Sequence, residues 1–185
     1  MSINDEFMRL DDPATLVLDA MIEKLQKREK PFGGYYLHPW LEQHYKPLLV
    51  RAWTENDPLD DPPLPSECPC VLIVGDENNP WTPHGAGAAT WEINYTLLMF
   101  LYDSDHRMAN RFRWLVTTAI GTPWMNTLDP IYASSSLCSK WGPSQGMGSG
   151  PVPIENRRGN HLWSAKLPLE FTFQGTNLPF FQPGM

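Results

Sequence analysis

The clearest pattern of apolar and polar positions lies in the second half of the chain. From Trp91 to Tyr102, apolar side chains alternate first with polar ones and then with further apolar ones. Alternation with a period of two is typical of a strand that has one exposed face, and a continuous apolar run is typical of a strand buried on both faces. The pattern therefore predicts one long strand, half-exposed at its start and buried on both faces at its end.

A helix is predicted directly after this strand, over residues 104–120. The Asp-Ser-Asp run that starts at Asp103 can cap it, and Gly121 can end it. Apolar side chains recur at helical spacing, so we expect this helix to pack on the sheet through Phe112, Leu115 and Val116.

Weaker patterns complete the fold. Pro13 opens a helical apolar pattern that ends before Gly33, and residues 162–174 alternate as a second long strand. Pro168 lies on the outward face of that strand, which indicates an edge strand or a bulge. Shorter strands are expected at residues 48–53, 71–74 and 131–137. The predicted fold class is α+β, an antiparallel sheet flanked by two main helices.

Long segments rich in proline and glycine separate these elements. Residues 54–69 hold five prolines, and residues 76–89 and 139–153 are also rich in glycine and proline. Proline disrupts the interior of a helix or a central strand, so all three segments are predicted to be loops. We expect one domain over residues 1–175 and an extended arm over residues 176–185.

Charge is distributed unevenly along the chain. Residues 1–90 hold 15 acidic and 7 basic side chains, and residues 91–185 hold 6 and 7, which together give the net charge of −7. Residues 54–79 are the extreme, with seven carboxylates and no lysine or arginine. Binding to duplex DNA requires a basic surface, so the composition excludes a protein that binds duplex DNA.

No catalytic, cofactor or metal site is predicted. Cys68 and Cys70 form a C-x-C pair without a second pair of zinc ligands, and we interpret both as buried apolar side chains at the start of a strand. The Gly-Asp-Glu run from Gly75 resembles an esterase motif but has glutamate where the nucleophilic serine belongs. The glycine-rich run 146–150 lacks the strand and helix of a phosphate-binding loop. We therefore expect that the protein is not an enzyme.

Several side chains are candidates for contact with a partner. Trp91 lies at the exposed start of the long strand, and Phe180 and Phe181 lie in the C-terminal arm. Arg107 and Arg111 are four residues apart on the predicted helix, on the side opposite its apolar positions. Aromatic side chains and arginine are enriched in interfaces, so these five residues form the candidate interface.

The order of these elements resembles that of the tail terminator, or tail-completion, family of long-tailed bacteriophages. The resemblance covers about residues 12–175: an amphipathic helix, a strand, a long strand leading through Asp103 into a helix that ends near Gly121, and a closing strand from His161 to Gln174. It implies a hexameric ring that caps the tail tube and joins it to the head, with tail tube protein and a head-completion protein as partners. It also implies a virion location, with assembly in the host cytoplasm.

The long loops and the arm depart from a compact terminator. They leave open another neck component, such as a head-closure or tail-adaptor protein, and a cytosolic enzyme or binding module remains a further alternative. In a neck ring, DNA passes through the lumen without specific binding, and Asp57, Asp60 and Asp61 are the candidate lumen lining. No signal peptide or run of about 18 apolar residues is visible, so we expect no membrane association.

Overall fold

The computed structural model describes residues 13–30, 34–53, 58–75, 81–84, 88–121, 138–143, 150–157 and 159–174. Within these residues there are three α-helices: α2 (Pro13–Gln26), α3 (Gly34–His44) and α4 (His106–Gly121). A short 3-10 turn, η1, covers Pro65–Glu67. The strands are β1 (Leu49–Trp53), β2 (Cys70–Gly75), β3 (Trp81–His84), β4 (Ala88–Asp103), β5 (Cys138–Pro143), β6 (Val152–Arg157) and β7 (Asn160–Gln174).

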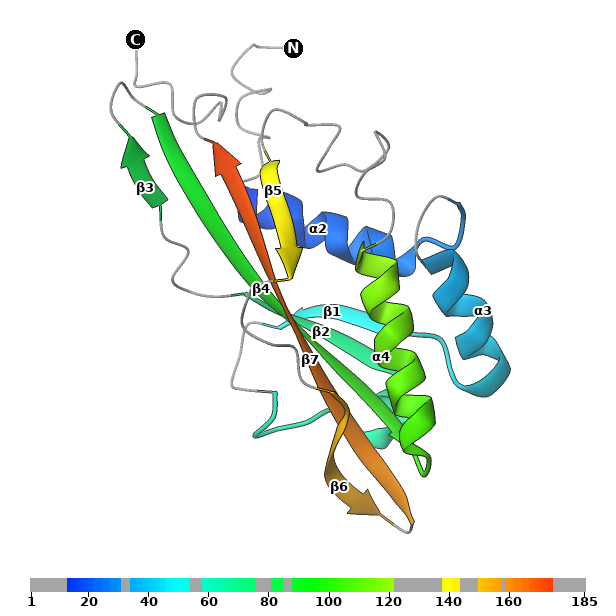
Figure 1. Cartoon of the computed structure of the whole chain (residues 1–185). Coiled ribbons are helices and arrows are strands. Elements are labelled where there is room, and N and C mark those ends of the chain that lie inside the picture. The colour runs from blue at the N-terminus through cyan, green and yellow to red at the C-terminus, as the bar shows by residue number, and fades with distance from the viewer. Residues whose placement is uncertain are drawn as a thin grey trace, which may run out of the picture.

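A long antiparallel ribbon of β4 and β7 forms the centre of the sheet (Figure 1). Its register runs from Thr90 opposite Gln174 to Asp103 opposite His161. Strands β2 and β3 pair with successive parts of β4, and β5 and β6 pair with successive parts of β7. The α+β class and the mostly antiparallel sheet are therefore confirmed.

The outermost strand, β1, differs from the predicted antiparallel arrangement, because it pairs with β2 in parallel. Two parallel neighbours require a crossover connection rather than a hairpin. The 16 residues between Trp53 and Cys70 supply it, and η1 lies within them. The sheet is thus mixed at this edge.

All three helices contribute to the main core, on one face of the sheet (Figure 1). Alternate β4 residues from Ile93 to Leu101 point into this core, where Phe112 and Val116 of α4 are buried against them. Leu115 is only partly buried but packs against the same core, so all three residues predicted to pack α4 on the sheet contribute to it. The predicted burial of both faces at the end of β4 is confirmed, since residues 97–101 are all buried.

The other face of the sheet carries a smaller apolar cluster. Leu72, Leu98 and Phe100 are buried in it, together with Cys68 and Cys70. Part of the proline-rich segment lies over this cluster, because Leu59 packs against it and Pro58, Pro63 and Pro69 are buried. The predicted loop is therefore also a cover for the second face of the sheet.

Helix α3 was missed by the sequence patterns, which predicted two main helices. Its buried side consists of Gly34, Leu37, His38 and Leu41. A Cβ atom on Gly34 would lie 2.1 Å from the carbonyl oxygen of Lys27, so glycine alone permits this close approach to the end of α2. His38 is held there by a hydrogen bond of 2.7 Å between its Nε2 and the carbonyl oxygen of Leu25.

Two predicted loops also contain strands. β3 lies within residues 76–89, and all of β5 except Cys138, together with the start of β6, lies within residues 139–153. Each of these short strands forms main-chain hydrogen bonds with the edge of a longer strand. A short segment rich in proline and glycine gives no sequence pattern that predicts such pairing. The predicted strand 131–137 lies outside the described residues.

Pro168 lies in the central strand β7, opposite Thr96 of β4. On the other edge of β7, β6 pairs with residues up to Ser164 and β5 with residues from Leu169 onward. No described strand pairs with residues 165–168 on that edge, so a residue without an N–H group is tolerated there. Pro168 therefore indicated correctly that one edge of the strand is locally unpaired, but the strand itself is central and not an edge strand.

Candidate interaction surface

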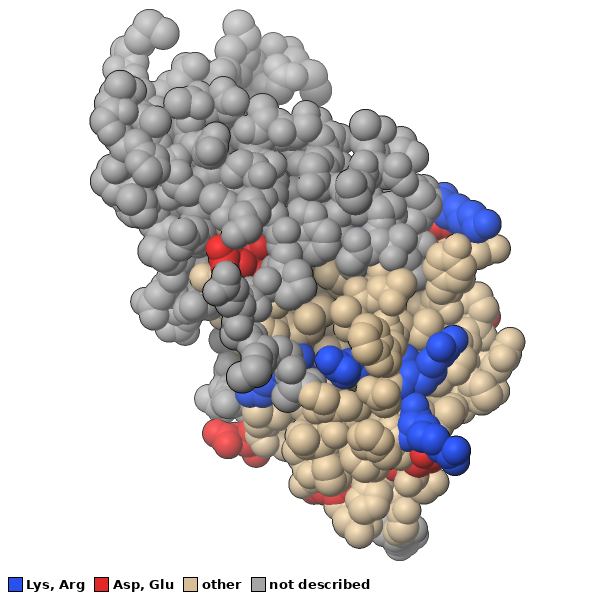
Figure 2. Space-filling model, viewed as in Figure 1, with Lys and Arg blue, Asp and Glu red and all other residues tan. Residues whose placement is uncertain are grey.

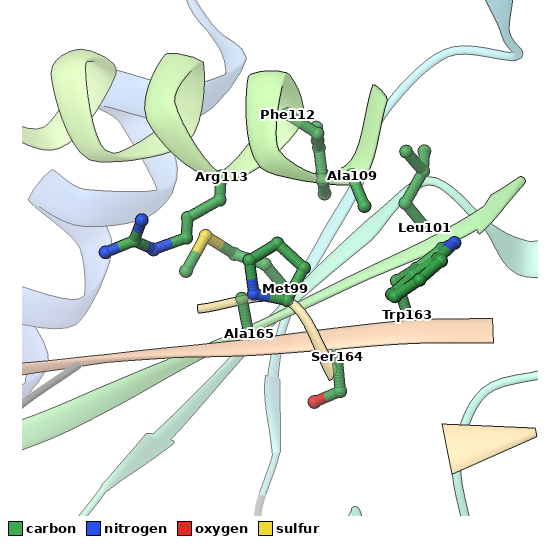
Figure 3. A pocket seen from close by; sticks show the side chains of 9 residues that line it. Met99, Leu101, Ala109, Phe112, Arg113, Trp163, Ser164 and Ala165 are labelled. Atoms are coloured by element: carbon green, nitrogen blue, oxygen red, sulfur yellow. The ribbon is translucent and has the colours of Figure 1, made fainter. Parts of the chain in front are cut away.

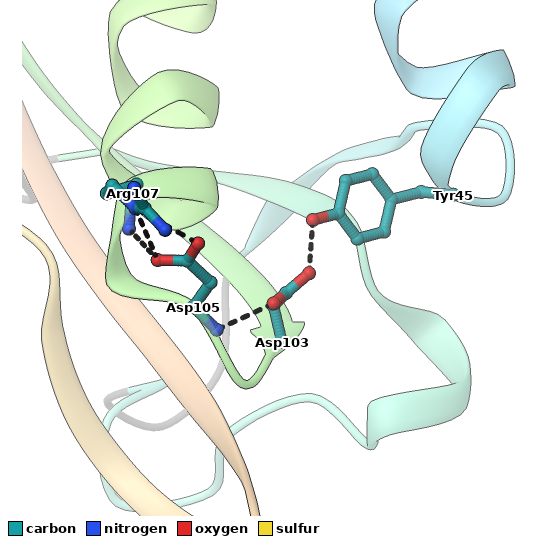
Figure 4. Close-up of polar contacts among 4 residues, drawn as sticks. All are labelled: Tyr45, Asp103, Asp105 and Arg107. Atoms are coloured by element: carbon teal, nitrogen blue, oxygen red, sulfur yellow. Dashed lines mark hydrogen bonds and ion pairs between the residues drawn. The ribbon is translucent and has the colours of Figure 1, made fainter.

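The start of α4 is fixed by two carboxylates that the sequence identified as caps (Figure 4). The backbone N–H of Arg107 donates to Oδ1 of Asp105 at 2.8 Å, and the N–H of Asp105 donates to Oδ1 of Asp103 at 2.7 Å. The backbone and side-chain hydrogen bonds from Arg107 lower the pKa of Asp105. The predicted cap is confirmed, and α4 therefore begins in a fixed orientation.

Asp103 also ties the end of β4 to two other elements. The Tyr45 hydroxyl donates to its Oδ2, and the indole N–H of Trp163 donates to its carbonyl oxygen at 3.0 Å. The ring of His106 lies edge-on to Trp163, with centroids 5.2 Å apart. These contacts hold the first turn of α4 against β7 and the end of α3.

With its start and its inner face fixed, α4 presents one side to solvent. Arg107, Arg111, Trp114 and Thr118 are exposed on it, at spacings of four, three and four residues. Residues at this spacing share one side of a helix. We refer to Arg107, Arg111 and Trp114 as the α4 outer face.

Trp114 is the most exposed tryptophan among the described side chains, with 56% of its surface accessible. The guanidinium carbon of Arg113 lies 5.3 Å from the centre of the Trp114 ring, within the range of a cation–π contact. A tryptophan held beside a cation and left in water is typical of a binding surface, because its apolar area gains free energy when a partner covers it.

The charge of α4 is opposite to that of the chain as a whole. The helix contains three arginines and no aspartate or glutamate, whereas the chain carries a net charge of −7. In Figure 2, Lys and Arg side chains gather where α4 lies in Figure 1. The α4 outer face is thus a basic and aromatic surface on an acidic protein.

A shallow depression lies between α4 and β7 (Figure 3). Met99, Phe112, Arg113 and Trp163 are among the side chains that line it, and its empty volume is about 160 Å³. This volume includes open solvent, and the enclosed part has no room for a water molecule. Small-molecule sites usually enclose about 300–1,000 Å³, so the depression is not a ligand pocket.

A second exposed patch lies on the segment that covers the other face of the sheet. Asp60 and Asp61 are exposed, and Leu64 is 57% exposed. Glu67 is engaged within the chain, because it accepts a hydrogen bond of 2.8 Å from the Leu64 N–H and lies 3.7 Å from Arg51. We refer to Asp60, Asp61 and Leu64 as the acidic patch.

The structure places some of the predicted interface residues and not others. Arg107 and Arg111 lie together on the α4 outer face, as predicted. Trp91 lies in β4, opposite Phe173, and not on α4. Phe180, Phe181 and Asp57 lie outside the described residues.

Trp114 was not recognised in the sequence. Its position gave the signal, because it is three residues after Arg111 and falls on the charged side of the helical pattern.

Three further titratable groups, Cys68, Cys70 and Tyr45, lie buried or partly buried within the fold. Burial raises the pKa of Cys68 to about 12 and also raises the pKa of Cys70, while Tyr45 has a raised pKa through burial and its contact with Asp103. The prediction that both cysteines are buried at a strand start is confirmed. Within the described ranges, no group of three or more His, Cys, Asp or Glu side chains is placed to hold a metal ion.

Comparison with known proteins adds no relative. No protein-family model matches the chain, and no curated protein has significant sequence similarity to it. None of the helices in the described part of the chain is long and apolar enough to cross a membrane.

Proposed function

We propose that this chain is a ring-forming structural subunit of a phage tail, a tail terminator at the neck between head and tail. The observation that carries the proposal is the α4 outer face, where Trp114 is exposed between arginines on a helix fixed at its start and along its inner side. Trp and Arg are the residues most enriched among those that dominate interface energies. A rigid helix that presents them supports a role in assembly.

The order and arrangement of elements support the narrower assignment to a tail terminator. An N-terminal helix, a strand, a long strand, a helix capped by Asp105 and a closing strand occur in this order, with α3 and shorter strands between them. This is the order on which the resemblance rests. The helices lie on one face of a mostly antiparallel sheet, which is the arrangement that the resemblance implies.

In this role the protein acts through surfaces alone. A ring of subunits, six if the resemblance holds, covers the end of the tail tube that would accept the next tube subunit, and growth stops. The opposite side of the ring then offers a site to a head-completion protein. DNA passes through the lumen without specific binding, and the virion neck is the location.

Loss of the protein during phage assembly tests the proposal. In a phage whose genome encodes this chain, a nonsense mutation in its gene should yield tail tubes of uncontrolled length that are not joined to heads. Electron microscopy of the lysate measures both properties. Tails of normal length that lack heads would instead indicate a head-closure or adaptor protein, and intact virions of normal length would contradict any role in the neck.

A further inference from the structure

The acidic patch has no counter-charge of its own among the described residues. Asp60 and Asp61 form no ion pair there, and the sequence from residue 54 to residue 79 contains no lysine or arginine. Leu64, four residues after Asp60, adds an exposed apolar side chain. The patch therefore combines two carboxylates with one apolar contact.

The α4 outer face has the complementary composition. Arg111 forms no ion pair with a described carboxylate, and the side chain of Arg107 remains 90% exposed although it lies 3.2 Å from Asp105. Trp114 supplies the apolar contact. Arg107 and Trp114 are seven residues apart, or about 10 Å along the helix at 1.5 Å per residue. Two arginines and a tryptophan thus match two aspartates and a leucine in charge and in apolar character.

The two patches lie on opposite faces of the sheet. Helix α4 packs on the core to which Leu97 and Met99 contribute, and the segment of the acidic patch packs on the cluster to which Leu98 and Phe100 contribute. Successive residues of a strand point to opposite faces. The patches of one molecule therefore point in different directions, so each is free to contact a different neighbour.

We propose that the α4 outer face of one copy docks on the acidic patch of a second copy. A contact between two different surfaces of the same protein joins copies head to tail, and such contacts generate a ring when the rotation closes. The inference rests on the proposed function, since it names the contact that builds the ring. The favoured partner is a second copy and not nucleic acid, because the chain carries a net charge of −7 and an acidic surface of matching composition.

Complementary charge reversals test this contact. Arg107→Glu with Arg111→Glu reverses one surface, and Asp60→Arg with Asp61→Arg reverses the other. Each double variant alone brings like charges together at every contact, so light scattering should give the mass of a single chain for each. Mixed in equal amounts, every contact again joins opposite charges, and the assembled mass should return.

Matched controls separate this effect from net charge and from misfolding. Lys30→Glu with Lys46→Glu, and Asp19→Arg with Glu29→Arg, change exposed residues outside both patches by the same total charge and should leave assembly unchanged. Trp114→Ala should raise the dissociation constant for self-association about 30-fold or more without reversing a charge. Circular dichroism of every variant verifies the fold.

Each outcome decides between the possible roles of the two surfaces. Failure of the mixture to assemble, or assembly of either double variant alone, would overturn the contact between the two patches. Assembly that survives every substitution would leave the phage experiment, and so the proposed function, unaffected. If the reversal on α4 abolishes binding to a duplex oligonucleotide but not assembly, the surface binds nucleic acid and the proposal fails.

Discussion

The hydroxyl of Tyr45 donates a hydrogen bond to Oδ2 of Asp103, which joins the end of α3 to the end of β4 (Figure 4). Asp103 in turn accepts the backbone N–H of Asp105, the residue that caps α4. One carboxylate therefore connects the helix missed by the sequence patterns to the helix that carries the candidate interface.

Tyr45→Phe removes this hydrogen bond and leaves the ring in place. The free energy of unfolding should fall by about 1–3 kcal/mol, the usual loss when a buried or partly buried acceptor loses its donor. Urea denaturation measures the change. Tyr36→Phe is the matched control, because Tyr36 is 55% exposed, and its stability should stay within about 0.5 kcal/mol of the parent protein.

The contact between Tyr45 and Asp103 predicts that the stability of the protein falls at alkaline pH. Burial, and then the contact with Asp103, raise the pKa of Tyr45 above its ordinary value of about 10, so the folded state favours the neutral hydroxyl. The stability that Tyr45 contributes is complete below pH 10 and declines as the pH rises above 10 toward the folded pKa. Tyr45→Phe should flatten this part of the stability curve, and an unchanged alkaline slope would contradict the assignment.

The inner side of α4 gives a prediction about the core. Val116 is fully buried and Leu115 only partly, so Val116→Asp places an unpaired charge in the core whereas Leu115→Asp leaves a route to water. Val116→Asp should unfold the domain, and Leu115→Asp should cost about 1–3 kcal/mol. Circular dichroism and urea denaturation compare them. Equal loss of structure in both variants would show that α4 is rotated relative to this description.

The two cysteines next to Pro69 should be unreactive in the folded protein. Burial raises the pKa of Cys68 from about 9 to about 12, so the reactive thiolate is scarce at neutral pH. Alkylation of Cys68 by iodoacetamide at pH 7.5 should therefore be roughly 100-fold slower, or more, in the folded protein than in urea. Peptide mass mapping follows each cysteine separately, and equal rates in both states would contradict the burial.

Patterns along the sequence were sufficient where one residue and its immediate neighbours decide the structure. The alternation through Leu97 and Leu98 fixed β4 and both of its faces, and the Asp105 cap fixed the start of α4. Helix α3 could not be predicted, because its inner side depends on a close approach of Gly34 to α2 and on a hydrogen bond from His38 to Leu25. Such features exist only after the two helices have packed.

For the candidate surfaces too, the sequence predicted the residues but not how the fold arranges them. Charge alone marked Arg107, Arg111, Asp60 and Asp61 as exposed. That the two pairs lie on opposite faces of one sheet depends on the parallel crossover from β1 to β2, which carries the acidic segment over the second face. No local pattern encodes this connection.

Asp60 and Asp61 also separate two hypotheses about the ring. As lumen lining they would repel passing DNA, and their replacement by lysine would leave assembly intact while slowing DNA ejection, more so at low salt. As part of the contact with α4, they are required for assembly itself. We expect loss of assembly, whereas an intact ring with slowed ejection would favour the lumen.

The most direct test of the account is the mass of the purified protein, measured by light scattering over a range of concentrations. The account predicts a mass that is a whole multiple of one chain, six if the resemblance holds, and a mass of one chain for the variant with Arg107→Glu and Arg111→Glu. A mass of one chain for the unaltered protein at every concentration would contradict both the ring and the contact proposed to build it.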